Sequence, residues 1–333
     1  MGSISSLASG NEYNSTKNQT NPSRYCGYVE GNQDINQVQM YLTTILTFII
    51  SGFGFVGNGT VICLLLFYIK RNHFTTYILN LSVADLGVVT GLLSINAYWL
   101  VSRLPIVKYE DPLKSIFRTF FLVMYCTSQF LLTVISIDRC ASIFFPIWYR
   151  YHQPQKFSII VCAVIWILIT PLFPAHISLY LHLRYCEIWF YLFLMNAVLF
   201  TPGMTVTTVA ILIKVCLISP QYKRGKILIA ILLALLFFLL FALPMNIIQY
   251  LSFKVPNFDH SYFYEYGYIC AAINSSVNPY IYFFIGRGKG GQNRKKIHKI
   301  LQNIFKEEDS RALENPSSNS TYNASIKSAI ATV

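Results

Sequence analysis

Ser128-Gln-Phe-Leu-Leu-Thr-Val-Ile-Ser-Ile-Asp-Arg-Cys140 is a largely apolar stretch that ends abruptly in an acid–base pair, Asp138-Arg139. An arginine at the end of a hydrocarbon-spanning helix is costly unless it is paired or hydrated. At about 3.6 residues per turn, Ser128 lies about three turns before Arg139 and Arg118 nearly six, near one stripe. Such a helix would join a polar cytoplasmic end, a polar middle and an extracellular mouth. An ordinary spanning helix with a terminal arginine that reaches the interface fits the same local pattern.

The composition around this stretch is typical of a membrane protein. Hydrophobic residues make up 54% of the 333-residue chain and charged residues only 12%, about half the charged share of soluble domains. Several mostly apolar runs of about 20 residues or more follow one another, and each is long enough to cross a bilayer. We therefore expect an all-α, polytopic membrane protein.

Seven apolar runs give a bundle of seven transmembrane helices. The predicted spans are 40–69, 75–101, 113–145, 156–180 (ending near Pro171 and Pro174), 187–217, 223–253 and 261–286. With the N-terminus outside, only eight of the 26 basic residues lie outside, in agreement with the excess of Lys and Arg on cytoplasmic loops. The net charge of +12 thus indicates orientation and contact with anionic membrane lipid, and not nucleic-acid binding.

Polar segments flank the predicted helical bundle at 37–286. Residues 1–36 form an extracellular tail, in which Asn14-Ser-Thr and Asn18-Gln-Thr are plausible glycosylation sites. Residues 287–306 are expected to form a basic amphipathic helix, the eighth, on the inner membrane surface. Residues 307–333 should be a disordered cytoplasmic tail.

Asp85 is the only acid in the interior of a predicted span, and its ionised form needs partners there. The available polar residues on the same or neighbouring runs are Asn58, Ser128, Asn274, Ser275 and Asn278. One carboxylate and several neutral oxygens could form a small-cation site or a hydrated hydrogen-bond network. Simple adhesion between helices is the alternative.

Taken together and in order, these motifs resemble the rhodopsin-like G-protein-coupled receptors. The matching pieces are Gly57-Asn58, Leu81-Ser-Val-Ala-Asp85-Leu, Asp138-Arg139-Cys140, Trp166, Pro202, Pro244 and Asn278-Pro279-Tyr280-Ile281-Tyr282. The resemblance covers about 37–305. Local runs such as Arg71-Asn-His-Phe-Thr-Thr-Tyr-Ile and Phe241-Ala-Leu-Pro-Met are similar to the Mas-related receptors within that class.

Departures from the broader class fit the same subfamily. Ala242 replaces the usual tryptophan of the sixth span, and Cys140 replaces the tyrosine after the Asp-Arg pair. Lys114 stands where a disulfide cysteine is usual, so that bond cannot form. Arg224 stands where an acid usually forms an ion pair with the arginine of the third span. Arg224 and Arg139 would therefore repel each other instead of holding the two spans together. Phe121 occupies the position of the amine-binding aspartate, which argues against a biogenic amine ligand.

The resemblance implies a plasma-membrane receptor that a peptide or small molecule activates and that drives nucleotide exchange on a heterotrimeric G protein. Arg139 would leave Asp138 and meet the G protein as the span 223–253 swings outward, while Tyr282 would turn inward. Asp85, Ser128, Asn274 and Asn278 would hold Na⁺ in the inactive state. The cytoplasmic tail with its Ser and Thr residues would contact arrestin.

Charged and aromatic residues near the outer ends of the spans suggest a ligand mouth. Arg118 lies one turn above Phe121, and Glu187 and Glu265 lie near the outer ends of the spans 187–217 and 261–286. An aromatic wall would come from Tyr98, Trp99, Trp189, Tyr250 and Tyr264. Charges at helix ends are usually solvated or face lipid, which is the alternative. Cys26 and Cys186 are the cysteines clearly on the oxidising side, and they either pair or remain free thiols.

Other classes fit the sequence less well. A retinal pump needs a Schiff-base lysine in the last span, and 261–286 contains none. A transporter usually shows internal repeats, and an enzyme needs a nucleophile–base pair or a metal cluster; we find neither. A receptor-like protein that signals constitutively, or modulates other receptors without its own ligand, stays open as the alternative.

Overall fold

A computed structural model of the chain describes residues 37–69, 71–102, 112–145, 147, 149, 156–183, 194, 198, 201–214, 233, 236–237, 240–248, 250–251 and 260–287. Its helices are α1 (Gln37–Phe67), α2 (His73–Ser102), α3 (Pro112–Phe144), α5 (Phe157–Ile169), α6 (Leu172–Leu183), α8 (Thr201–Ile213) and α10 (His260–Arg287). The glycosylation sites, Cys26, Cys186, the amphipathic helix and the cytoplasmic tail lie outside the described residues, as does most of the spans 187–217 and 223–253.

The helices α1, α2, α3 and α10 begin and end within three residues of the predicted spans. Helical segments over Val38–Phe67, His73–Ser102, Pro112–Phe144 and Phe157–His182 are long and apolar enough to cross a membrane. The α8 helix lies within the predicted span 187–217. The ends of these helices are predictable from sequence because a transmembrane helix must form all its backbone hydrogen bonds internally across a bilayer of fixed thickness.

The fourth predicted span, 156–180, is interrupted next to Pro171, one of the two prolines near which the sequence predicts its end, and a further helix continues beyond the break. The α5 helix ends at Ile169 and α6 starts at Leu172. Pro171 has no N–H to donate, and its ring crowds the preceding turn. A short bond from the Phe173 N–H to the Thr170 carbonyl (3.1 Å) tightens this junction. Pro174 lies in the first turn of α6, where its missing donor costs nothing.

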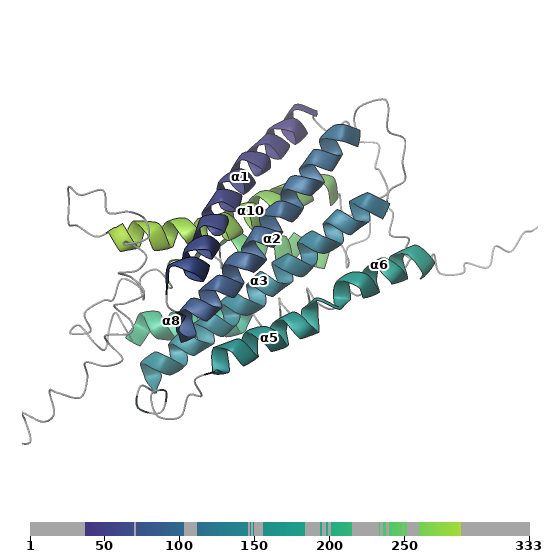
Figure 1. The fold of residues 1–333 in the computed structure, drawn as a ribbon. Coiled ribbons are helices and arrows are strands. Elements are labelled where there is room, and N and C mark those ends of the chain that lie inside the picture. The colour runs from purple at the N-terminus through teal and green to yellow at the C-terminus, as the bar shows by residue number, and fades with distance from the viewer. Residues whose placement is uncertain are drawn as a thin grey trace, which may run out of the picture.

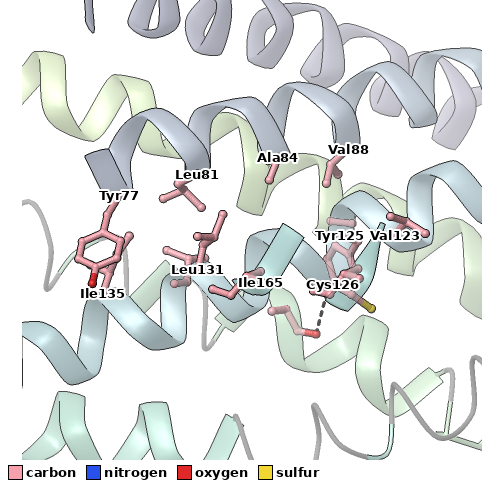
Figure 2. Close-up of a cluster of buried hydrophobic side chains, with 14 of the residues drawn as sticks. Tyr77, Leu81, Ala84, Val88, Val123, Tyr125, Cys126, Leu131, Ile135 and Ile165 are labelled. Carbon is pink, nitrogen blue, oxygen red and sulfur yellow. Dashed lines mark hydrogen bonds between the residues drawn. The ribbon is translucent and has the colours of Figure 1, made fainter. Parts of the chain in front are cut away.

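The α3 helix occupies the centre of the described bundle. In its most apolar window 72% of the residues are buried, against 33% in the corresponding α1 window and 22% in that of Phe157–His182. It packs against α2, α5, α6 and α8. Figure 1 shows α1, α2 and α3 running side by side, with α10 crossing α1 and α2. In Figure 2, Tyr77 and Leu81 of α2 face Ile135 and Leu131 of α3.

Two glycines bring α2 and α3 into close contact. A Cβ on Gly87 would lie 2.5 Å from Met124 Cγ, and one on Gly91 would lie 3.0 Å from the Phe121 Cα. Lipid tails are as apolar as leucine, so helices in a membrane associate through such close packing between small residues. The position of Phe121 at the upper part of the bundle therefore depends on Gly91.

Side chains also bond α1 to α10 along an edge that we call the α1–α10 seam. Gln39 Nε2 donates to Tyr266 Oη (2.8 Å), Ser276 Oγ to the Ile50 carbonyl (3.1 Å) and Tyr280 Oη to the Phe53 carbonyl (3.0 Å). These residues are more than 220 positions apart in the sequence. The seam closes the bundle by joining its first described helix to its last.

Candidate functional site

Asp85 is completely buried and accepts hydrogen bonds from two other helices. Ser128 Oγ of α3 donates to Asp85 Oδ1 (2.6 Å), and Asn278 Nδ2 of α10 donates to Asp85 Oδ2 (2.8 Å). Charge-assisted bonds of this kind are about twice as strong as neutral ones. The single carboxylate of α2 thus connects three helices that the sequence separates by up to 193 residues.

Asn58 repairs the backbone next to the proline of α10. Pro279 cannot donate to the carbonyl of Ser275, four residues earlier. Asn58 Nδ2 donates to that carbonyl (2.9 Å) and to the Gly54 carbonyl of its own helix (3.0 Å). The buried amide therefore stabilises the interrupted part of α10 from α1, and its bonds go to backbone rather than to Asp85.

Several buried polar atoms on α1 and α10 keep unused hydrogen-bonding capacity. Asn58 Oδ1, Asn274 Nδ2 and Ser51 Oγ are buried without a hydrogen-bond partner among the described residues, and the buried Ser275 side chain interacts with Asp85. A buried polar group without a partner costs about 1–3 kcal/mol. We call Asp85, Ser128, Asn278 and these four residues the polar centre. Its donor set of one carboxylate with neutral oxygens suits a hard, oxygen-loving cation of low charge or water.

Asp138 and Arg139 form an ion pair near the C-terminal end of α3, with 3.1 Å between Arg139 Nη2 and Asp138 Oδ2. The Tyr149 hydroxyl lies 3.0 Å from both carboxylate oxygens of Asp138. The Arg139 guanidinium lies over the Phe74 ring of α2, 4.5 Å from its centroid. Both charged side chains are nearly buried. The Asp138 carboxylate, the Tyr149 phenol that bonds to it and the Phe74 ring together offset the cost of burying the Arg139 charge.

Tyr282 follows Asn278 by about one helical turn on α10 and is buried. It lies within electrostatic reach of Asp85. Tyr282, which the sequence predicts to take part in coupling, thus lies on the same helix as Asn278 of the polar centre.

The α3 helix also has polar contacts with the described segment 240–248, which surrounds Pro244. The Tyr125 hydroxyl donates to the Ala242 carbonyl (3.2 Å), and Asn246 Nδ2 donates to Gln129 Oε1 (3.4 Å). Gln129 and Asn246 are both buried. Sequence reasoning missed this amide pair; its only signal was two polar side chains inside apolar runs.

Among the residues proposed for the ligand mouth, Phe121 is buried in an aromatic stack. Its ring packs edge-on against Tyr268 of α10 (5.4 Å between centroids) and stacks on Tyr125 (5.6 Å). Arg118 is half-buried one turn above. The adjacent Thr119 Oγ1 lies 3.1 Å from His176 Nδ1 of α6, a buried pair that sequence reasoning did not identify.

The other mouth residues are more scattered. Glu265 of α10 is hydrogen-bonded to Thr43 of α1, so its carboxylate lies at the α1–α10 seam. Trp99 packs edge-on against Tyr41 of α1 (5.2 Å). Tyr250 is exposed. Glu187, Trp189 and the side chain of Tyr264 lie outside the described part of the structure. Among the described residues, Arg118 and Phe121 therefore lie together on α3, as the sequence predicts.

A family comparison agrees with this arrangement. The model for the 7 transmembrane receptor (rhodopsin family) matches residues 57–282, which include Asn58, Asp85, Arg139 and Pro279. The chain belongs to the rhodopsin family of seven-transmembrane receptors, a family of receptors and not of enzymes. The predicted all-α, seven-helix fold is thereby confirmed.

Within that family the chain is similar to Mas and to Mas-related receptors. It is 32% identical to the proto-oncogene Mas of Homo sapiens over 269 residues, 78% of this chain and 82% of that protein. It is 29% identical to the Mas-related G-protein coupled receptor member A1 of Mus musculus over 280 residues, 81% of this chain and 91% of that protein. These similarities confirm the predicted Mas-related membership. A multi-pass plasma-membrane receptor with a G protein and a ligand as partners follows from that family.

Proposed function

We propose that this receptor responds to a peptide or small-molecule ligand by moving the span 223–253 away from α3, and that the opened cytoplasmic face drives nucleotide exchange on a heterotrimeric G protein. The observation that supports this proposal most directly is Arg139. It is nearly buried, it is paired with Asp138, and it lies where a partner could reach it from the cytoplasm once the helices separate.

The contacts between α3 and the segment 240–248 support a movable interface. Both polar bonds are long, at 3.2 and 3.4 Å, and each joins neutral groups. Neutral hydrogen bonds contribute only about 0.5–1.5 kcal/mol each. A ligand that binds the open arrangement better by a few kcal/mol can therefore shift the equilibrium. Pro244 lies between the two contacts on that segment, and a proline permits a bend there.

Na⁺ is the cation we propose for the polar centre. The Asp85 carboxylate, the Ser128 and Ser275 hydroxyls and the amide oxygen of Asn58 supply hard oxygen ligands in a buried place. Asn274, which the sequence predicts for the same site, is buried next to Ser275 on α10. The ion would neutralise Asp85 and favour the closed arrangement. A cation that binds one state better than the other acts as an allosteric ligand.

The ligand mouth in this proposal is centred on α3. The half-buried Arg118 would bind a carboxylate of the ligand, and aromatic contacts would extend from Phe121, with Tyr250 at the rim. The sequence predicts Glu187, Trp189 and Glu265 for the same ligand mouth. Glu265 contacts Thr43 of α1, so we propose that it lies at the edge of this mouth, away from Arg118. Arrestin, through the Ser and Thr residues of 307–333, is proposed as a second cytoplasmic partner.

Constitutive signalling without a ligand is the second candidate function. It is favoured by Arg224, which stands where an acid would otherwise hold the third-span arginine in the resting state. Basal nucleotide exchange in ligand-free membranes separates the two candidates, because a ligand-dependent receptor gives a low basal rate and a large stimulated one.

Arg139→Ala tests the proposed coupling function. Loss of the guanidinium should abolish ligand-stimulated and basal nucleotide exchange while surface expression stays near normal. Arg71→Ala is the matched control, because Arg71 is an exposed arginine four residues after the end of α1. Full signalling by a well-expressed Arg139→Ala receptor would exclude the proposed role.

A further inference from the structure

Lys214, which directly follows α8, makes two contacts with the last turn of α3. Its Nζ donates a hydrogen bond to the carbonyl of Ile143 (2.9 Å). The same ammonium lies over the ring of Phe144, 4.5 Å from the centroid. The side chain is partly buried between the two helices. Such double attachment fixes the position of a long, flexible side chain that would otherwise point into the cytoplasm.

A second bond joins the same two helices higher up. Ser136 Oγ and Thr207 Oγ1 are 2.6 Å apart. Seven residues separate Ser136 from Ile143 on α3, and seven separate Thr207 from Lys214. Seven residues are about two helical turns. The two contacts therefore repeat at the same spacing on both helices, as expected of helices that run side by side in the same direction, and Lys214 holds the lower end.

The chemistry of the lower contact suits a lysine. The last carbonyls of a helix have no partner in their own helix, and the negative end of the helix dipole attracts a cation. The aromatic face of Phe144 adds a cation–π contact. Arg139, one turn before Ile143, is occupied by Asp138 and by Phe74 of α2. Each cationic side chain thus holds the end of α3 to a different neighbour.

We propose that Lys214 is a positioning residue for G-protein coupling: it fastens the cytoplasmic end of the fifth span to the last turn of α3 and restrains the receptor in the closed state. This inference rests on the proposed function. It supplies the restraint that a charge pair between α3 and the sixth span cannot provide here, because Arg224 is basic. Opening the cytoplasmic face then requires Lys214 to release the Ile143 carbonyl.

Lys214→Met, Lys214→Arg and Phe144→Leu, compared at matched surface expression without ligand, test this restraint. Methionine is nearly as long as lysine, but it has no donor for the Ile143 carbonyl and no charge for the Phe144 ring, so basal G-protein dissociation should rise about three- to tenfold. Arginine keeps the charge and the donors, so it should restore a basal rate near that of the wild type. Phe144→Leu should give a smaller rise. Lys156→Met is the control, because Lys156 is an exposed lysine at the start of α5.

Adding Arg139→Ala to Lys214→Met separates this inference from the proposed function. The double variant should return to background. If it keeps the raised signal, the coupling role of Arg139 is wrong and the restraint by Lys214 stands. If Lys214→Met has a basal rate at or below wild type, or if Lys214→Arg behaves like Lys214→Met, the restraint is rejected.

A distance measurement on purified receptor gives a readout that does not depend on any G protein. Spin labels introduced as noncanonical amino acids at Ile137 of α3 and Ile213 of α8 avoid the native cysteines, and both sites are exposed. The wild type and Lys214→Arg should give one narrow distance distribution. Lys214→Met should add a second, longer distance. An unchanged distribution in Lys214→Met overturns the inference, whatever the signalling assays show.

Discussion

At the scale of single residues, Asp85 carries the negative charge of the polar centre. Asp85→Asn keeps the shape and removes the charge, so any dependence of ligand affinity on Na⁺ should disappear, because the ion loses its only carboxylate there. Ligand binding in Na⁺ and in a large organic cation at equal ionic strength measures this. Thr127→Ala is the control, because the Thr127 hydroxyl bonds only within its own helix, to the Val123 carbonyl. Persistent Na⁺ sensitivity in Asp85→Asn would place the ion elsewhere.

Arg118 provides a prediction about ligand chemistry. A charge-assisted contact contributes about 1.5–3 kcal/mol, so Arg118→Ala should weaken the potency of a carboxylate-bearing agonist about ten- to a hundredfold without lowering its maximal response. Dose–response curves for that agonist and for its amide measure the effect. The amide should be equally potent on both receptors. A carboxylate agonist with the same potency on wild type and variant would remove Arg118 from the mouth.

Two sets of buried polar residues show which contacts the sequence can predict and which it cannot. Asp85, Ser128 and Asn278 were grouped from sequence, because an acid inside a span requires polar partners at the same depth, and the structure brings these three together. Gln129 and Asn246 were not paired. A neutral amide imposes no such requirement, and which neighbour it meets depends on the rotation of each helix. The same holds for Lys214, which from sequence is one of several cytoplasmic lysines.

At the scale of helices, Gly91 sets the distance between α2 and α3. Gly91→Ala would place a methyl group against the Phe121 backbone, which cannot rotate away as a side chain could. Overpacking of this kind costs about 1–3 kcal/mol, so the melting temperature of the purified receptor should fall by several degrees. Gly52→Ala in α1 is the matched control, since a Cβ there meets nothing within 4 Å. Equal melting temperatures for the two variants would contradict this account of the contact.

The two prolines of the fourth span show that the sequence pattern alone does not determine where a helix breaks. Pro171 interrupts the helix, whereas Pro174, three residues later, lies in the first turn of α6. Both prolines favour a break, and the sequence analysis placed the end of the span near either one. Which of the two prolines breaks the helix depends on where the next helix starts, because a proline is tolerated in the first turn of a helix.

At the scale of the whole molecule, the orientation in the membrane can be tested by glycosylation. With an extracellular N-terminus, replacing both Asn14 and Asn18 by Gln should increase gel mobility and abolish the mobility shift that a glycosidase produces in the wild type. Asn58 is the internal control. It also stands in a sequon but is buried in α1, so the Asn14/Asn18 variant should show no residual glycan. Unchanged mobility would indicate that neither site is modified or that the tail lies inside.

The α1–α10 seam has a consequence for the biogenesis of the receptor. Ser275, whose carbonyl accepts the bond from Asn58, is synthesised 217 residues after it. At about 5–20 residues per second, translation takes about 10–40 s to cover that distance. During this interval the nascent α1 is in the membrane without the Ser275 carbonyl that accepts the bond from Asn58 in the folded receptor. Variants that weaken the contacts between α1 and α10 should therefore first reduce the number of receptors that reach the cell surface. The receptors that do reach the surface should still signal normally.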